Sequence, residues 1–187
     1  MAKLPEAVQG INWITYFRIL ENDSTEDAHL IPWEDSGEFN RSRDSDTKTT
    51  KSGSITTGGG METELNFECA DTVSPLTADL DRAINKNLPV EVWRINHQIK
   101  NESGEYLGYY TQGVVSENNL SADTDDVATR SITITGKGTP QKGWLALSDD
   151  KEAEIDYVFR GVKKLTEDDQ TGEGTAFNEN TDRELSF

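Results

Sequence analysis

The chain has 187 residues, of which 35 are acidic and 18 basic, so that its net charge is −17 and its hydrophobic content is 33%. A chain of this length can bury a core as one domain, whereas its charge disfavours binding to nucleic acids or anionic membranes, which need clustered Lys and Arg. Cys69 is the single cysteine, which excludes an internal disulfide framework, and no apolar run reaches the length of a membrane span.

The N-terminal third is predicted to be β-structure that follows a short arm. Residues 1–9 form the arm and lack the apolar segment of a secretory signal. Residues 11–20 alternate as a strand, and residues 28–33 follow as an edge strand because a proline interrupts them. Residues 61–69 alternate apolar and acidic side chains, which predicts a strand with one buried and one acidic face.

A long polar segment, RSRDSDTKTTKSGSITTGGG, precedes that last strand at residues 41–60. A structureless loop of this length is uncommon in a compact domain unless it is functional or disordered. Its charge is 4 − 2 = +2, because Asp44 and Asp46 oppose four cations, which are Arg41, Arg43, Lys48 and Lys51. A positive arm on an acidic body can reach a second copy of that body, so we predict an assembly loop whose hinge is the glycine run Gly58, Gly59 and Gly60.

One helix is predicted, beginning with Ser74 as N-cap and Pro75 as first residue, and ending at Asn87. It has an apolar stripe made by Leu76, Leu80, Ala83 and Ile84. Further strands are predicted at residues 90–100, 106–117, 128–138, 144–147 and 154–162, with a polar loop at 118–126, although Ser148 could instead cap a short helix.

The pattern predicts a mostly β fold, an antiparallel β-sandwich or half-barrel with one flanking α-helix and a long hairpin loop. The predicted organisation is an arm at residues 1–9, a β domain at 10–162 and an acidic tail at 163–187.

The residues give no sign of catalysis or of a bound cofactor. His29 and His97 are far apart in sequence and Cys69 has no partner at metal-ligand spacing, so we predict no metal site, because structural zinc needs four convergent ligands. The acidic loop with Asp123, Asp125 and Asp126 lacks the glycine and terminal glutamate of an EF-hand. No nucleophile motif is present. We therefore expect a protein that is not an enzyme.

The order of these parts resembles the major tail proteins, or tail-tube proteins, of long-tailed (siphovirus-type) phages of Gram-positive bacteria. The resemblance covers roughly residues 10–160 and is carried by the first strand, the long hairpin loop, the strand that ends near Cys69, the helix SPLTADLDRAINKN and the strand LPVEVWRIN. It implies a β-sandwich that assembles into hexameric rings, which stack into a hollow tube that conducts DNA, with the long loop bridging neighbours.

The resemblance also implies partners and a location. The partners are further copies of the chain and the tape measure, tail terminator and distal tail proteins, with DNA passing through unbound and no membrane involved. An acidic lumen would repel phosphates and let DNA slide. The location is the virion tail, and the lone cysteine suits assembly in the host cytoplasm.

Two other functions stay open. The four tryptophans, Trp13, Trp33, Trp93 and Trp144, could form a sugar-stacking platform, which would make the chain a carbohydrate-binding or adhesin module. In a chain of low hydrophobicity, core packing is the favoured interpretation of these residues. The high negative charge would also suit a nucleic-acid mimic that inhibits a basic enzyme.

Overall fold

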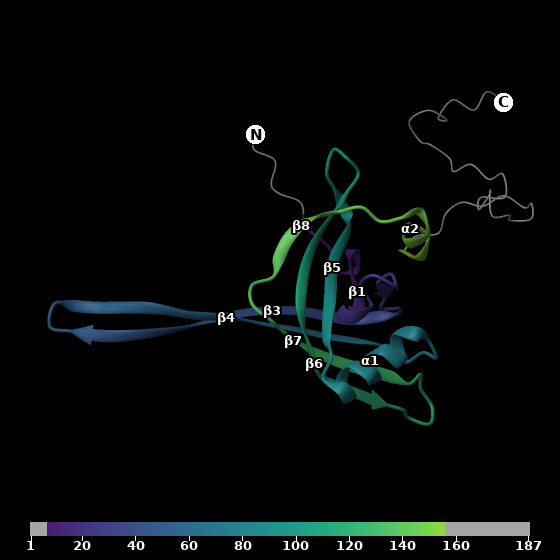
Figure 1. The fold of residues 1–187 in the computed structure, drawn as a ribbon, viewed down its shortest axis with the longest axis horizontal. Coiled ribbons are helices and arrows are strands. Elements are labelled where there is room, and N and C mark those ends of the chain that lie inside the picture. Colours follow the sequence, from purple (N-terminus) through teal and green to yellow (C-terminus); the bar gives the residue numbers. More distant parts are fainter. Residues whose placement is uncertain (1–6, 156–187) are drawn as a thin grey trace, which may run out of the picture. The chain divides into compact units, whose positions relative to one another are not determined.

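A computed structural model describes residues 7–155. They divide into two units at the Ala146–Leu147 junction, and each unit is described by itself. The first contains eight strands and the helix α1, and the second contains the short helix α2 (Figure 1). The elements are η1 Gly10–Asn12, β1 Trp13–Ile19, η2 Leu20–Asn22, β2 His29–Leu30, β3 Glu34–Thr50, β4 Gly53–Ala70, α1 Pro75–Lys86, β5 Pro89–Lys100, β6 Tyr106–Ser121, β7 Thr129–Gly136, β8 Gln141–Leu145 and α2 Asp149–Ile155.

All eight strands belong to one antiparallel sheet. Seven follow the order β2-β1-β5-β6-β7-β4-β3, and β8 lies off this path and pairs with β6. Strand β6 has two further partners besides β5. Its first half pairs with β8, where Tyr106 lies opposite Leu145, and its second half pairs with β7, where Gly113 lies opposite Gly136. The predicted class, mostly antiparallel β with a flanking helix, is confirmed. Within residues 7–155, no helix has the length and apolar content needed to cross a membrane.

The core lies on one face of this sheet. Phe17 and Ile19 of β1 face Val92 and Val90 of β5, as the alternation predicts for a strand with one buried side. Strands β4 and β7 supply a second set of facing pairs, Leu65 with Ile134 and Phe67 with Ile132. The predicted helical stripe is confirmed, because Leu76, Leu80 and Ala83 are buried in the same core and Ile84 packs against it.

Polar contacts join strands that are distant in the sheet order. Arg94 on β5 forms an ion pair with Glu34 at the start of β3, although three strands separate them in the sheet. The same guanidinium donates to Thr15 Oγ1 of β1 at 2.6 Å. The backbone N–H of Ile31 donates to the Thr15 carbonyl at 2.9 Å, just before the chain enters β3. The sheet therefore folds over its own core, in agreement with a sandwich or half-barrel.

Helix α1 begins and ends where its local sequence requires. The Ser74 side chain accepts a hydrogen bond from the Thr77 N–H at 3.4 Å, and Pro75 occupies the first turn. Asn87 is left-handed, with φ of 50°, and the N–H of Leu88 donates to the Ala83 carbonyl at 3.0 Å. This is a common way to end a helix, and it confirms the predicted boundaries.

Outside the long hairpin, four predicted segments differ from the structure. The strand expected at 144–147 is β8, which begins earlier and ends at Leu145. The edge strand expected at residues 28–33 has two strand residues, because Trp33 adopts a positive φ of 53° that turns the chain into β3. The loop expected at 118–126 begins later, since β6 continues to Ser121 alongside β7. The strand expected at 154–162 is wrong at its start, where α2 ends at Ile155; residues 156–162 lie outside the described part, as does the predicted tail.

The tryptophans do not form the core. Trp33 and Trp144 are 79% and 48% exposed, and Trp13 and Trp93 are half-buried. The favoured interpretation of these residues as core packing is therefore wrong, because aliphatic side chains and phenylalanines fill the core. Trp93 packs beside Tyr110, with ring centroids 5.4 Å apart, and lies under the Arg18 guanidinium.

Candidate assembly surface

The segment predicted as a structureless loop, residues 41–60, is a regular two-stranded hairpin. β3 continues to Thr50 and β4 begins at Gly53, so that Lys51 and Ser52 make the turn. Thr50 Oγ1 donates to the Gly53 carbonyl at 2.7 Å. The prediction of a structureless loop is wrong, whereas the prediction of a long hairpin at this place is confirmed. Figure 1 shows the hairpin extending beyond the other strands of the first unit.

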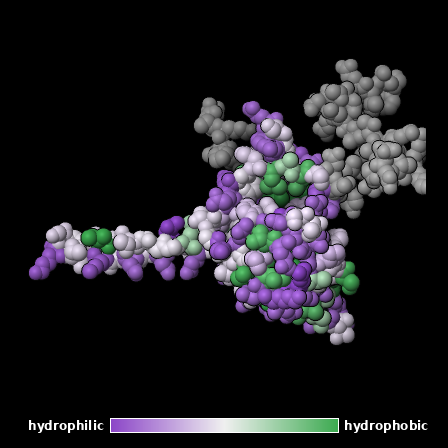
Figure 2. All heavy atoms as spheres, in the orientation of Figure 1, coloured by the Kyte–Doolittle hydropathy of each residue, from purple (hydrophilic) through white to green (hydrophobic). Residues whose placement is uncertain are grey.

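The two faces of this hairpin differ chemically. Lys48 lies opposite Ile55 and Asp46 opposite Thr57, which places two charged side chains and the one large apolar side chain on the same face. The other face carries hydroxyl groups, such as the facing Thr47 and Thr56, whose Oγ1 atoms are 3.1 Å apart. Every residue of 41–60 is exposed, and Figure 2 shows the hairpin mainly in the purple and white of hydrophilic and intermediate residues.

The structure separates the four predicted cations into two pairs. Arg41 and Arg43 lie at the base of the hairpin, where Arg43 Nη1 donates to the Gly59 carbonyl at 3.1 Å. Lys48 and Lys51 lie near the tip. The projecting residues 44–60 contain two cations and two acids, so their net charge is 2 − 2 = 0. The positive charge of the segment therefore belongs to its base.

The glycine run lies inside β4, opposite a break in the pairing register. The register shifts between Arg43 and Ser45, which are paired with Met61 and Gly58. A β-carbon on Gly59 would lie 3.2 Å from the Asp44 carbonyl oxygen, so the strands approach closely there. Such a bulge locally increases the twist of a strand pair. The role of this run as a hinge stays a prediction.

A cluster of aromatic rings and cations surrounds the base of the hairpin, and the sequence pattern did not reveal it. Tyr109 of β6 stacks on Trp13 of β1, with centroids 6.0 Å apart, and lies 5.3 Å from the Phe39 ring of β3. The Arg41 guanidinium lies 5.0 Å from the Phe39 centroid and 5.4 Å from that of Tyr109, and Lys142 lies 5.8 Å from Tyr109. Cation–π contacts of this kind fix Arg41 against the sheet.

The face of β4 that points away from the core is acidic, as the alternation predicts. Its exposed carboxylates are Glu62, Glu64 and Glu68. The residues paired with them on β3 and β7 are polar, for example Asn40 and Thr135 on either side of Glu64. This part of the sheet presents a polar, anionic surface without cations among the paired residues.

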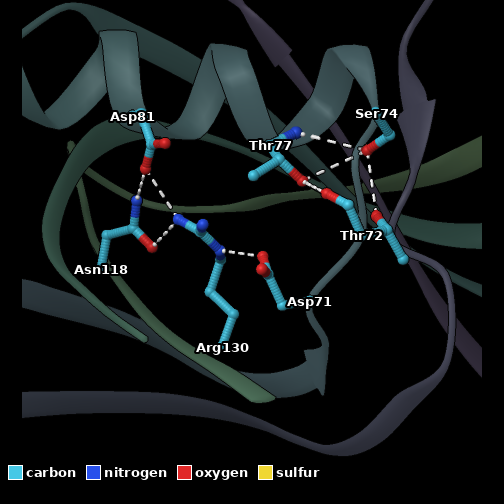
Figure 3. A network of polar contacts seen from close by, with 7 residues as sticks. All are labelled: Asp71, Thr72, Ser74, Thr77, Asp81, Asn118 and Arg130. Carbon is cyan, nitrogen blue, oxygen red and sulfur yellow. Dashed lines mark hydrogen bonds and ion pairs between the residues drawn. The ribbon is translucent and has the colours of Figure 1, made fainter. Parts of the chain in front are cut away.

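A buried arginine anchors helix α1 to the sheet (Figure 3). Arg130 of β7 donates to Asp71 at 2.9 Å, to Asp81 of α1 at 2.7 Å and to Asn118 of β6 at 2.9 Å. Burial by itself would lower the pKa of Arg130, but the hydrogen bonds to Asp81 and Asp71 outweigh it and raise that pKa. Since Asn118 also donates to Asp81 at 2.9 Å, three elements, α1, β6 and β7, and the segment after β4 meet at this one charge.

Cys69 is buried in β4. Burial raises the pKa of its thiol to about 11, and the nearby Arg130 opposes that effect in part. Asp123, Asp125 and Asp126 are exposed in the loop between β6 and β7.

The comparisons with known proteins agree with this architecture. The sequence profile of the phage tail tube protein family matches residues 7–142. No curated protein matches the chain. Among solved structures, the chain resembles the SPP1 tail tube, with 17% identity, a TM-score of 0.69, and coverage of 90% of this chain and 96% of that one.

Two further structures have the same fold. One is from the tail of an empty gene transfer agent particle, determined with C6 symmetry, with 9% identity, a TM-score of 0.57, and 72% and 98% of the two chains covered. The other is from the baseplate of the anti-feeding prophage, with 11% identity, a TM-score of 0.56, and coverage of 78% and 100%. The family match extends over most of the described sheet, including the hairpin and α1, and on that match the chain belongs to the phage tail tube protein family, as a structural component of the virion.

Proposed function

We propose that the chain is a major tail protein that forms hexameric rings, and that these stack into the tail tube of a long-tailed (siphovirus-type) phage of a Gram-positive host. The observation that carries the proposal is the hairpin at residues 44–60, which is regular, fully exposed and covered by no other described element. A ring stack needs contacts that do not close within one ring. A projecting hairpin supplies such a contact between rings, and the C6 symmetry of the gene transfer agent tail supports a six-membered ring.

We assign the acidic face of β4 to the lumen of this tube. Glu62, Glu64 and Glu68 are exposed, and their strand neighbours carry polar groups. A wall of carboxylates repels the phosphates of passing DNA, whereas a basic wall would hold it through many salt-dependent contacts. DNA then moves from capsid to host without specific binding.

In this function the chain acts as a scaffold and not as an enzyme. Its partners are copies of itself along the tube, the tape measure protein inside it, and the terminator and distal tail proteins at its ends. Assembly takes place in the host cytoplasm. Arg41 and Arg43 orient the hairpin at its base, while Lys48, Lys51 and Ile55 make the contact with the next subunit, and the glycine run Gly58, Gly59 and Gly60 lets the hairpin adjust.

The test is a hairpin-shortened variant. Arg43 pairs with Met61, so residues 44–60 are replaced by Asn-Gly, which closes a two-residue hairpin at this point. The monomer should keep its melting temperature, because the removed part contains one large apolar side chain. Tube formation, followed by sedimentation and negative-stain microscopy, should be lost. Tubes of normal length from this variant would refute the assignment of the hairpin to assembly.

Matched charge reversals separate the base from the tip. Replacement of Lys48 and Lys51 by Glu should weaken assembly while leaving the monomer unchanged, because each exposed ion pair contributes about 0–1 kcal/mol but repeats at every subunit. Replacement of Arg41 and Arg43 should also reduce monomer stability, since Arg41 packs on two rings. A tip variant that assembles like the wild type would show that the tip lysines make no contact between subunits.

The carbohydrate-binding alternative keeps one supporting observation, the exposure of Trp33 and Trp144. This alternative requires that a bound glycan quench the fluorescence of Trp33 and Trp144. Binding of the purified monomer to a glycan array tests it. The family match favours the tube.

A further inference from the structure

Three potential metal ligands meet at the edge of the sheet, where the sequence pattern predicted none. They are Glu26, in the turn before β2, His29 in β2, and Asp79 in α1, and one ligand atom from each lies within 4.8 Å of the other two. His29 Nε2 is 3.9 Å from Asp79 Oδ2. The prediction relied on histidine and cysteine spacing, whereas this group contains one imidazole and two carboxylates from three separate elements.

The imidazole nitrogen that faces the carboxylates is buried and lacks a hydrogen-bond partner among the described residues. Buried polar atoms of this kind are rare and need an explanation. The 3.9 Å separation from Asp79 is too long for a hydrogen bond. A cation between the two groups would satisfy both.

The charges of the site also favour a cation. Partial burial raises the pKa of Asp79, and the nearby Glu26 carboxylate raises it further, while His29 and Arg82 oppose these effects. Arg82 is itself ion-paired with Glu21. Two carboxylates thus face each other with little neutralising charge of their own.

The positions of these groups are set by their surroundings. Arg18 donates to the backbone carbonyls of Asp23 and Glu26 at 3.3 and 3.0 Å, which fixes the turn before β2. His29 is held by the pairing of β2 with β1, opposite Phe17. Asp79 lies on α1, which is capped at Ser74 and buried through Leu80. The site is therefore built on ordered elements.

We propose that Glu26, His29 and Asp79 bind one divalent transition-metal ion, with zinc as the best match, and that the ion joins α1 to the edge strand β2. Zinc takes nitrogen and carboxylate oxygen ligands at roughly 2.0–2.2 Å, so that tetrahedral ligand atoms lie about 3.4 Å apart. Rotation of the carboxylates would close the difference from the observed separations, which are 3.9 Å between His29 and Asp79 and within 4.8 Å for the pairs that include Glu26. The imidazole disfavours calcium and magnesium, which prefer all-oxygen sites. Water completes the four ligands.

The test uses the full chain, stripped with a chelator and titrated with zinc in a calorimeter and with cobalt in a spectrophotometer. We expect one ion per chain, a rise in melting temperature, and the ligand-field absorption of tetrahedral cobalt. The variants Glu26→Gln, His29→Gln and Asp79→Asn should each weaken zinc binding at least about tenfold and abolish the rise in melting temperature.

Two control variants, His97→Gln and Asp125→Asn, change the same kinds of group elsewhere and should bind zinc like the wild type. Glu26 is exposed, so the Glu26→Gln variant should fold normally. This variant keeps the test decisive even if the other two variants are unstable. Absence of saturable binding, or binding that the three variants leave unchanged, would overturn the proposal. Neither result depends on whether the chain forms tubes.

Discussion

Replacement of Arg130 by methionine tests whether one buried charge anchors α1 to the sheet. Methionine keeps much of the volume and none of the donors, so Asp71, Asp81 and Asn118 each lose a hydrogen bond. The two carboxylates also lose their counter-ion. The core beneath the helix, formed by Leu76, Leu80 and Ala83, is not touched by the change.

The exposure of Asp71 and Asp81 determines how much stability the loss of Arg130 costs. Removing one member of a fully buried ion pair costs about 3–5 kcal/mol, because the remaining charge is left unpaired. Here the Arg130 side chain is 8% exposed, but those of Asp71 and Asp81 are 25% and 52% exposed, so water can solvate both carboxylates once the arginine is gone. We therefore expect a loss of about 2–3 kcal/mol in the free energy of unfolding. The variant Asp81→Asn should cost about 1 kcal/mol, since Arg130 keeps Asp71.

Urea denaturation of the monomer, followed by circular dichroism, measures both values. The slope of the free energy against urea should stay the same, because neither change alters the surface exposed on unfolding. An Arg130→Met variant within about 0.5 kcal/mol of the wild type would refute the anchoring role. So would a greater loss from Asp81→Asn than from Arg130→Met, because the argument requires the arginine to be the shared partner.

Two further predictions concern buried positions. The Cys69 thiol, with its pKa raised to about 11 from 9.0, has about a hundredfold less thiolate than an unperturbed thiol below pH 9. Alkylation of Cys69 in the native protein should therefore be slow, and it should become fast in urea. Rapid labelling of the folded monomer would contradict the burial of this thiol. The variant Gly113→Ala should lose roughly 2–3 kcal/mol in the free energy of unfolding or misfold, because the new β-carbon would lie 2.4 Å from the Thr135 carbonyl oxygen. The control variant Gly60→Ala meets no atom within 4 Å and should stay within about 0.5 kcal/mol of the wild type in the same urea assay. Equal losses in the two variants would contradict the close approach of the strands at Gly113.

Helix α1 could be predicted from sequence because its signals are local. Ser74, Pro75 and Asn87 each act within one turn of the helix, and Leu80 belongs to a stripe that any core would bury. The strands around the core were found for the same reason, since alternation reports a buried face wherever one exists. The end of α2 shows the limit: the run predicted as a strand begins at Glu154 and Ile155, which are the last two residues of the helix. Periodicity over so few residues does not separate a strand from the end of a helix.

The outer hairpin and the candidate metal site needed tertiary information. Residues 44–60 have no apolar face, so nothing in their pattern distinguishes a strand from a loop. The backbone pairing of β3 with β4 makes this segment a hairpin. Glu26, His29 and Asp79 are brought together by the docking of α1 beside β2, and their spacing along the chain does not encode that contact. The prediction that the tryptophans form the core is wrong because it rests on their size alone. Trp33, for example, lies at a turn with positive φ.

The hairpin at residues 44–60 is a ribbon two strands wide, so both of its long edges expose unpaired backbone groups. A ribbon of this kind is marginally stable by itself in water, and its open edges can template pairing with other chains. The charged residues of the first strand of this ribbon are two acids followed by one base, Asp44, Asp46 and Lys48. In the proposed tube, these charges would favour a register that brings cations of an incoming strand opposite Asp44 and Asp46. The ribbon would then gain its rigidity from the neighbouring subunit that receives it.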